Sequence, residues 1–198
     1  MINEFFLRFI LRSVLIINFM LIFNYNTFAK ENPNNEIAVL SGGCFWGVEE
    51  LFKNLDGVTD TQVGYSGGNT ENPIYETVST GLTGHAESVK IVFDKNKISY
   101  EKILKFFFSI HDPTQLNRQQ NDIGTQYRSE IFYLDLSQKI TAEKVINEAE
   151  KLKIYESKIQ TKISPFKKFY EAEKYHQDYL QKNPNGYTCH SIRTQWQF

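Results

Sequence analysis

The stretch that decides the fold reads Glu36-Ile-Ala-Val-Leu-Ser-Gly-Gly-Cys-Phe-Trp-Gly-Val-Glu-Glu-Leu-Phe-Lys53. Its apolar start predicts a strand over Ile37–Leu40. After the glycine pair, apolar residues recur at helical spacing, which predicts a helix over Phe45–Lys53. Cys44 is therefore expected at a strand-to-helix turn, where backbone N–H groups and the helix dipole favour a thiolate. This makes Cys44 a candidate nucleophile, with a buried and inert cysteine as the alternative.

The expected elements follow the order strand–helix–strand, strand–helix–strand and then a helical extension. This order predicts an α+β fold, a two-layer ferredoxin-like sandwich with a mainly antiparallel sheet, helices on one face and a helical C-terminal extension. Beyond the first strand and helix, we expect strands over Gly57–Tyr65, Ala86–Phe93, Ser129–Leu134 and Ile159–Ser164, and helices over Lys102–Ser109, Ser137–Leu152 and Phe169–Gln181.

The N-terminus has the pattern of a secretory signal peptide. A basic start, an apolar core over Ser13–Phe23 and a small residue at Ala29 predict that residues 1–29 are a leader cleaved after Ala29. Residues 30–35 read as a polar linker, and residues 36–198 as one domain. We therefore expect export to the periplasm or the extracellular space, with an uncleaved leader that anchors the protein in a membrane as the alternative.

The balance of charge argues against nucleic acid or an anionic membrane as the main partner. The chain has 22 basic and 23 acidic residues, and removal of residues 1–29 leaves 20 and 22. Export implies an oxidising compartment, in which the only two cysteines, Cys44 and Cys189, would by default form a structural disulfide. The residues alone do not separate a permanent bridge from a transient one.

Glu87 is the candidate acid. By strand alternation it shares a face with Val89 and Ile91, and burial of that face would raise the pKa of its carboxyl group and keep it protonated. The sequence His85-Ala-Glu87 resembles the H-x-E motif of zinc deaminases, but the chain has no C-x-x-C motif, so a zinc site is rejected.

A polar loop before the strand that starts at Ser129 is the second candidate region, because sites often form in loops at sheet ends. Tyr65 and Tyr75 add two phenols elsewhere in the chain. Several phenols that converge on one protonated carboxyl group would polarise a bound oxygen atom. The loop contributes Asp122, Gln126, Tyr127 and Arg128.

Taken together, five motifs closely resemble those of the A-type peptide methionine sulfoxide reductases, and the resemblance covers essentially all of residues 36–193. The motifs are Gly-Cys44-Phe-Trp-Gly, Val63-Gly-Tyr-Ser-Gly-Gly68, Gly84-His-Ala-Glu87, Asn121-Asp-Ile-Gly-Thr-Gln-Tyr-Arg128 and Asn185-Gly-Tyr-Thr-Cys-His190.

The resemblance implies a role for each candidate residue. Cys44 would be the nucleophile, and Glu87 would protonate the sulfoxide oxygen. Cys189 would resolve the intermediate. Phe45 and Trp46 would form a niche for the S-methyl group. Tyr75 and Tyr127 would donate hydrogen bonds to the oxygen, and Asp122 would order the site.

The resemblance also implies the reaction, that of a peptide-methionine (S)-S-oxide reductase. The S epimer of methionine sulfoxide, free or within proteins, would be reduced to methionine while Cys44 becomes a sulfenic acid. Cys189 would then form a disulfide with Cys44, and an external thioredoxin-like dithiol would reduce it. No metal or organic cofactor is expected, and we expect a monomer. The leader puts the identity of the reductant in doubt, because an exported enzyme cannot draw directly on cytosolic thioredoxin.

Two alternatives remain open on the residues alone. The first is a thiol hydrolase or acyl transferase, in which a histidine within hydrogen-bond reach of Cys44 would act as the base. The second is a secreted domain without enzymatic activity, held by a permanent bridge between Cys44 and Cys189. The histidines available to the first alternative are His85, His111, His176 and His190.

Overall fold

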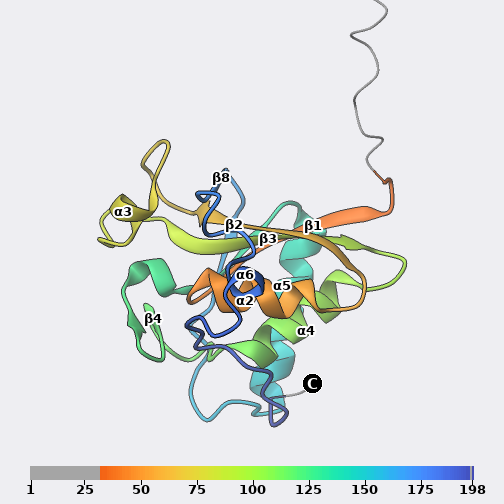
Figure 1. Ribbon diagram of the computed structural model, residues 1–198. Helices are drawn as coiled ribbons and strands as arrows, with labels where there is room; N and C mark the ends of the chain where they lie inside the picture. The colour runs from red at the N-terminus through yellow and green to blue at the C-terminus, as the bar shows by residue number, and fades with distance from the viewer. Residues whose placement is uncertain (1–31, 197) are drawn as a thin grey trace, which may run out of the picture. The chain divides into compact units, whose positions relative to one another are not determined.

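The computed structural model describes residues 32–196 and 198, and the predicted signal peptide lies outside them. The chain folds as an α+β protein (Figure 1). Its central sheet has six strands in the order β7-β6-β1-β3-β2-β8. The strands of this sheet are β1 Asn35–Gly42, β2 Val58–Ser66, β3 Ala86–Asp94, β6 Ser129–Tyr133, β7 Lys162–Pro165 and β8 Phe169–Glu171.

The helices lie mainly below the sheet in the view of Figure 1, as the sequence predicts for one covered face. A short two-stranded ribbon and one 3₁₀ turn complete the description. The helices are α2 Phe45–Lys53, α3 Tyr75–Val78, α4 Tyr100–Ile110, α5 Leu136–Lys151 and α6 Tyr179–Lys182, and the remaining elements are β4 Arg118–Gln119, β5 Asp122–Ile123 and η1 Thr125–Tyr127.

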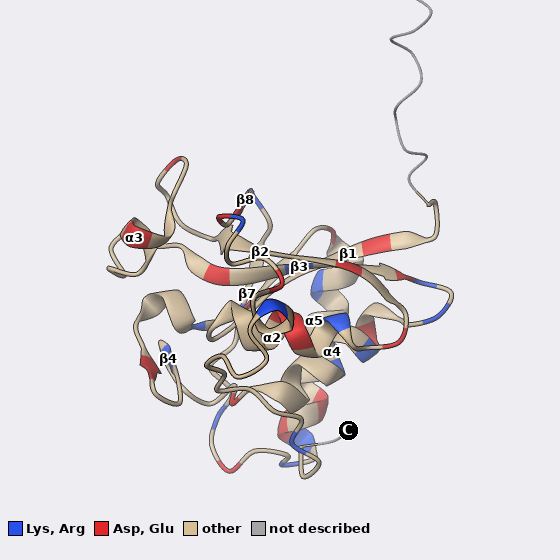
Figure 2. Ribbon diagram, viewed as in Figure 1, with Lys and Arg blue, Asp and Glu red and all other residues tan. Residues whose placement is uncertain are grey.

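The core lies between the sheet and the helices α2 and α4. Strand alternation places one set of side chains on this face, and the helices supply a matching apolar stripe. Acidic and basic residues are interspersed on the outer parts of α4 and α5 (Figure 2), where Lys105 pairs with Glu148 at 2.9 Å and Lys144 pairs with Glu101 at 2.7 Å. Fully buried core residues include Leu40, Phe52, Val63, Ile91, Phe93, Ile103, Phe107 and Ile131.

The sheet must curl, because its two outermost strands are almost adjacent in the sequence. Only residues 166–168 separate the end of β7 at Pro165 from the start of β8 at Phe169. Five inter-strand spacings of about 4.8 Å would hold the edges of a flat sheet about 24 Å apart, whereas the four residue steps span at most about 14 Å. The short link therefore draws the two edges toward each other.

The α+β class and the mainly antiparallel pairing agree with the sequence, but the two-layer ferredoxin-like sandwich does not cover this sheet. Strands β6 and β7 run parallel, while the other neighbouring strands run antiparallel. The two outermost strands extend the sheet beyond a four-stranded sandwich, and the result is a mixed, curled sheet.

The predicted C-terminal helix over Phe169–Gln181 is wrong. Its first three residues form β8, which pairs with the edge of β2, and only Tyr179–Lys182 is helical. Asp178 has a left-handed backbone (φ 56°), and the side-chain amide of Gln177 bonds both backbone groups of Val63. These contacts with β2 override a local helical pattern, because sheet pairing depends on residues far away in the sequence.

None of the helices in the described part of the chain has the length and apolarity that a membrane span requires.

We predict that Gly64→Ala destabilises the fold by preventing β8 from pairing with β2. A Cβ atom at Gly64 would lie 2.3 Å from the carbonyl oxygen of Tyr170 and 2.5 Å from the ring of Phe169. Overpacking of this kind costs about 1–3 kcal/mol, which urea unfolding would measure. The exposed Asp60→Ala change on the same strand serves as the control, and an equal midpoint for both variants would contradict the prediction.

Candidate active site

Cys44 lies at the turn between β1 and α2, as the sequence predicts. It occupies the N-cap position of α2, and only 7% of its surface is exposed. The chain reaches this turn through Gly43, whose φ of +106° favours glycine and whose Cβ atom would lie 2.6 Å from the side chain of Gln119. The turn therefore places the thiol under cover rather than at the surface.

Burial dominates the ionisation of Cys44. It raises the pKa of the thiol well above its ordinary value, and the nearby Glu87 carboxyl group raises it further, while the backbone N–H of Trp46 lowers it. The helix N-terminus thus acts in the expected direction but is outweighed by the loss of solvation. The resting group at neutral pH is a thiol, not the thiolate that the sequence pattern alone favours.

Glu87 lies on β3 and points toward the start of α2. It is 3% exposed, and its Oε2 atom accepts a hydrogen bond from the backbone N–H of Phe45 at 3.0 Å. Burial raises the pKa of Glu87 to about 8, against the opposing effect of that N–H and with a further rise from Asp122. At neutral pH, Glu87 is therefore mainly a neutral acid that can donate a proton. It is bonded to Phe45, the residue that follows Cys44.

Two of the predicted phenols face this pair. Tyr75 begins α3 and Tyr127 ends η1, and both are half-buried. Burial raises the pKa of each hydroxyl, and the neighbouring Glu87 and Cys44 raise both further. Tyr65 has a different place, because it is fully buried and its hydroxyl donates to Glu173 at 2.9 Å.

The two aromatics after Cys44 occupy different surroundings. Phe45 is 1% exposed and its ring centroid lies 5.1 Å from that of His176. Trp46 stacks on Tyr179 at 3.8 Å, and its Nε1–H donates to Nδ1 of His176 at 3.1 Å. Because His176 accepts at Nδ1, its neutral form carries the ring proton on Nε2. The result is an aromatic wall beside Cys44.

The C-terminal tail reaches the same site through Asp122. The carboxylate of Asp122 accepts from the hydroxyl of Tyr187 at 3.1 Å and from Sγ of Cys189 at 3.3 Å. His190 bonds the carbonyl oxygen of Gly42 at 2.8 Å, and a side chain at Gly47 would collide with Thr188 and His190. The tail therefore lies directly on the beginning of α2.

Both cysteines are free thiols, so the structure contains no permanent bridge between them. Burial raises the pKa of Cys189 to about 12, and the hydrogen bond and charge of Asp122 contribute to the rise. A hydrogen bond from the backbone N–H of Cys44 lowers the pKa of Cys189. The sulfur of Cys189 therefore lies next to Cys44.

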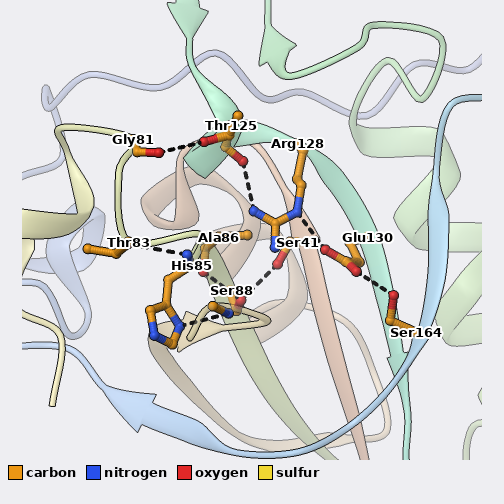
Figure 3. Close-up of polar contacts among 11 residues, drawn as sticks. Ser41, Gly81, Thr83, His85, Ala86, Ser88, Thr125, Arg128, Glu130 and Ser164 are labelled. Atoms are coloured by element: carbon orange, nitrogen blue, oxygen red, sulfur yellow. Dashed lines mark hydrogen bonds and ion pairs between the residues drawn. The ribbon is translucent and has the colours of Figure 1, made fainter. Parts of the chain in front are cut away.

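Other residues of the predicted polar loop do not face Cys44. Arg128 pairs with Glu130 at 2.6 Å, and Glu130 also accepts from Ser164 (Figure 3). Gln126 donates to the carbonyl oxygen of Ser79, which ties η1 to the loop that follows α3. A cavity of about 420 Å³ opens inside the curled sheet near this ion pair, and none of the residues around Cys44 lines it.

The structure also adds residues that the sequence did not single out. Glu173 contacts both Tyr65 and Tyr75, and Tyr187 holds Asp122. His176 and Tyr179 hold the indole of Trp46. The one sequence signal for these supporting contacts is the density of polar and aromatic residues in the C-terminal part of the chain.

The structure does not place a histidine base beside Cys44. In the part of the chain that it describes, none of the four histidines hydrogen-bonds the Cys44 thiol. Burial lowers the pKa of His111 to about 3 and of His190 to about 4. Each histidine ring bonds a different partner at the shortest distance. His85 bonds the carbonyl oxygen of Thr70, and His111 bonds that of Phe107. His176 bonds the Trp46 indole, and His190 bonds the carbonyl oxygen of Gly42.

Within residues 32–196 and 198, no group of three or more His, Cys, Asp or Glu side chains is arranged to hold a metal ion.

Comparison with known proteins gives one consistent family. Residues 36–197 match the family described as peptide methionine sulfoxide reductase. The chain is 54% identical over 152 residues to the peptide methionine sulfoxide reductase MsrA of Nautilia profundicola, a match that covers 77% of this chain and 86% of that protein.

Solved structures give the same result. The crystal structure of Mxr1 from Saccharomyces cerevisiae in reduced form has a TM-score of 0.78 at 38% identity and covers 84% of this chain and 97% of that one. Mxr1 in complex with Trx2 has a TM-score of 0.57 at 26% identity and covers 84% and 96%.

We predict that Asp122→Asn makes Cys189 more reactive toward alkylation. Removal of the carboxylate charge lowers the pKa of Cys189 from about 12, and each unit of decrease raises the thiolate fraction about tenfold. The rate of iodoacetamide modification at pH 8, followed by mass spectrometry in a Cys44→Ser background, measures the effect. The exposed Asp56→Asn serves as the control. A rate no higher than that of the parent would contradict the prediction.

Proposed function

Since this chain belongs to the peptide methionine sulfoxide reductase family and reduces methionine sulfoxide to methionine, we propose that Cys44 attacks the sulfoxide sulfur while Glu87 protonates its oxygen. The observation that carries this proposal is the contact between Phe45 N–H and Glu87 at 3.0 Å, which holds a neutral acid beside the thiol. A sulfoxide sulfur is a poor electrophile until its oxygen receives a proton, so an acid is needed next to the nucleophile.

In the first step, the sulfur of Cys44 bonds to the sulfoxide sulfur while the oxygen is protonated. The oxygen then moves to the Cys44 sulfur, and both the sulfur–oxygen bond of the substrate and the transient sulfur–sulfur bond break. The net change converts a Cys44 thiol and a sulfoxide into a Cys44 sulfenic acid and a thioether. Glu87 gives its proton to the oxygen, and the proton lost from the Cys44 thiol returns to Glu87, so that the acid is regenerated. The positive charge that develops on the protonated sulfoxide favours loss of the thiol proton, which burial otherwise opposes.

The surrounding residues orient the substrate. The aromatic wall of Phe45 and Trp46 suits the S-methyl group, because it is apolar and held by Tyr179 and His176. The hydroxyls of Tyr75 and Tyr127 are suited to donate to the sulfoxide oxygen. Asp122 orders the polar side of the site, where it is bonded to Tyr187.

In the second step, the Cys189 thiol attacks the Cys44 sulfenic acid, which forms a disulfide and releases water. The contact between Cys189 and Asp122, together with the seat of the tail on α2, supports this role. We propose that a thioredoxin-like dithiol then reduces the disulfide, in line with the structural likeness to Mxr1 in its complex with Trx2. We further propose that the reaction needs no metal or organic cofactor.

Three further proposals, on epimer preference, oligomeric state and export, come from the sequence. We propose that the enzyme prefers the S epimer, free or within proteins, which assay of the two separated epimers would test. We also propose that it acts as a monomer, which light scattering would test. We propose export directed by residues 1–29, which requires a reductant outside the cytosol. Cell fractionation and sequencing of the mature N-terminus would reject export if the full leader were found on a cytosolic protein.

We predict that the purified protein reduces methyl sulfoxides with dithiothreitol and that Cys44→Ser abolishes this activity. Cys189→Ser should retain a single turnover, because the first step needs only Cys44, and dimedone should trap one sulfenic acid per molecule. Methionine formation by chromatography and intact mass measure both outcomes. A burst of methionine formation in Cys44→Ser would contradict the prediction. Repeated turnover of an ester substrate without dithiothreitol would instead support a thiol hydrolase.

We predict that Glu87→Gln keeps the fold but lowers the single-turnover rate by about 10²-fold or more, the range of general acid catalysis. In the wild type, the rate should be level below pH 8 and fall above it, because the acid loses its proton near a pKa of about 8. The fall attributable to Glu87 should be absent in Glu87→Gln. An unchanged rate in this variant would remove Glu87 from the mechanism.

A further inference from the structure

We propose that Glu173 is a positioning residue that holds Tyr75 against the Cys44–Glu87 pair. The inference builds on the proposed function, in which the hydroxyl of Tyr75 donates to the sulfoxide oxygen. Glu173 does not touch the reacting atoms. It acts through two hydrogen bonds that link the loop carrying Tyr75 to the central sheet.

The first bond fixes the beginning of α3. The backbone N–H of Tyr75 donates to Oε1 of Glu173 at 2.9 Å. Helix α3 has only four residues, and the other hydrogen bonds of its backbone stay within residues 74–81. Among the described residues, Glu173 is the only side chain from outside this loop that bonds α3. Without it, the segment that carries Tyr75 would be held by packing and by the bonds that Gln126 and Thr125 donate to Ser79 and Gly81, beyond the end of α3.

The second bond fixes the carboxylate itself. The hydroxyl of Tyr65 donates to Oε2 of Glu173 at 2.9 Å, and Tyr65 is fully buried on β2. In the register of the sheet, Tyr65 stands directly opposite Glu87 on β3. Glu173 therefore connects Tyr75 to the sheet at the level of the acid, so the distance between the phenol and the acid is set by rigid neighbours.

The backbone around Glu173 is also tied to β2. Ala172 N–H donates to the carbonyl oxygen of Val63 at 3.0 Å, and the amide of Gln177 bonds the N–H and the carbonyl oxygen of Val63, each at 2.9 Å. Glu173 thus projects from a segment anchored on both of its sides. Because both its backbone and its carboxylate are held, the side chain of Glu173 can fix the position of Tyr75 relative to the sheet.

Only an ionised carboxylate satisfies both donors. Burial acts to raise the pKa of Glu173, but the Tyr75 N–H and the Tyr65 hydroxyl outweigh it, and the pKa is lowered. Each oxygen then accepts one bond. An amide at this position can accept from the Tyr75 N–H and donate to the Tyr65 oxygen, because a hydroxyl can also accept. Glutamine should therefore preserve most of the link, whereas alanine removes it.

The test is a double-mutant cycle of Glu173→Ala and Tyr75→Phe, read as the single-turnover rate of methionine formation by pre-reduced protein. We expect Glu173→Ala to lower the rate by about 10-fold to 10²-fold, as for a misplaced donor. Added to Tyr75→Phe, it should lower the rate by no more than about twofold further. Glu173→Gln should recover most of the wild-type rate.

The matched control is Glu171→Ala, which removes an exposed carboxylate two residues away with no side-chain bond in the structure. Thermal unfolding checks that each variant is folded. If Glu173→Ala does not fold, Tyr65→Phe replaces it in the cycle, since it removes the bond that fixes the carboxylate. A rate within about twofold of wild type, or effects of the two changes that multiply independently, would overturn the inference.

A second measurement does not depend on activity. Hydrogen–deuterium exchange over residues 71–80 should be faster in Glu173→Ala than in the wild type and unchanged in Glu171→Ala. Unchanged exchange in Glu173→Ala would overturn the inference even for an active enzyme. Absence of methionine formation by the wild type would overturn the proposed function instead, and the exchange result would still decide the role of Glu173 in placing Tyr75.

Discussion

The hydrogen bond from Phe45 N–H to Glu87 is the contact on which the rest of the site depends. The first N–H groups of a helix have no partner within the helix, and here one of them bonds a carboxyl group on the neighbouring strand. This bond fixes the start of α2 relative to β3 and so sets Cys44 beside its acid. It also satisfies part of a carboxyl group that is buried almost completely, which would otherwise be costly to cover.

The curled sheet and the tail complete this arrangement from two sides. Because the link between β7 and β8 is so short, β8 reaches the free edge of β2, and the chain then crosses toward α2. From there, His176 and Tyr179 support Trp46, while Glu173 reaches the phenol loop. The segment that follows β7 therefore brings the outer parts of the candidate site onto the turn that carries Cys44.

Local patterns in the sequence were sufficient for the centre of the site but not for its periphery. The period change after Leu40 placed Cys44 at a helix start, and strand alternation placed Glu87 on the buried face. The helix expected over Phe169–Gln181 failed because pairing with β2 is a contact between distant segments. The same limit hid the role of Glu173. The neutral state of Cys44 was also hidden, because burial depends on the whole fold.

The burial of Cys44 has a consequence for the survival of the protein. Agents that oxidise methionine also attack thiolates and can carry them irreversibly to sulfinic and sulfonic acids. A thiol kept protonated in a covered turn presents little of its vulnerable form to such agents. In the mechanism proposed above, the thiol loses its proton when a protonated sulfoxide is bound beside it. Reactivity would then be coupled to occupancy, because the empty site keeps Cys44 in the form that oxidants attack least.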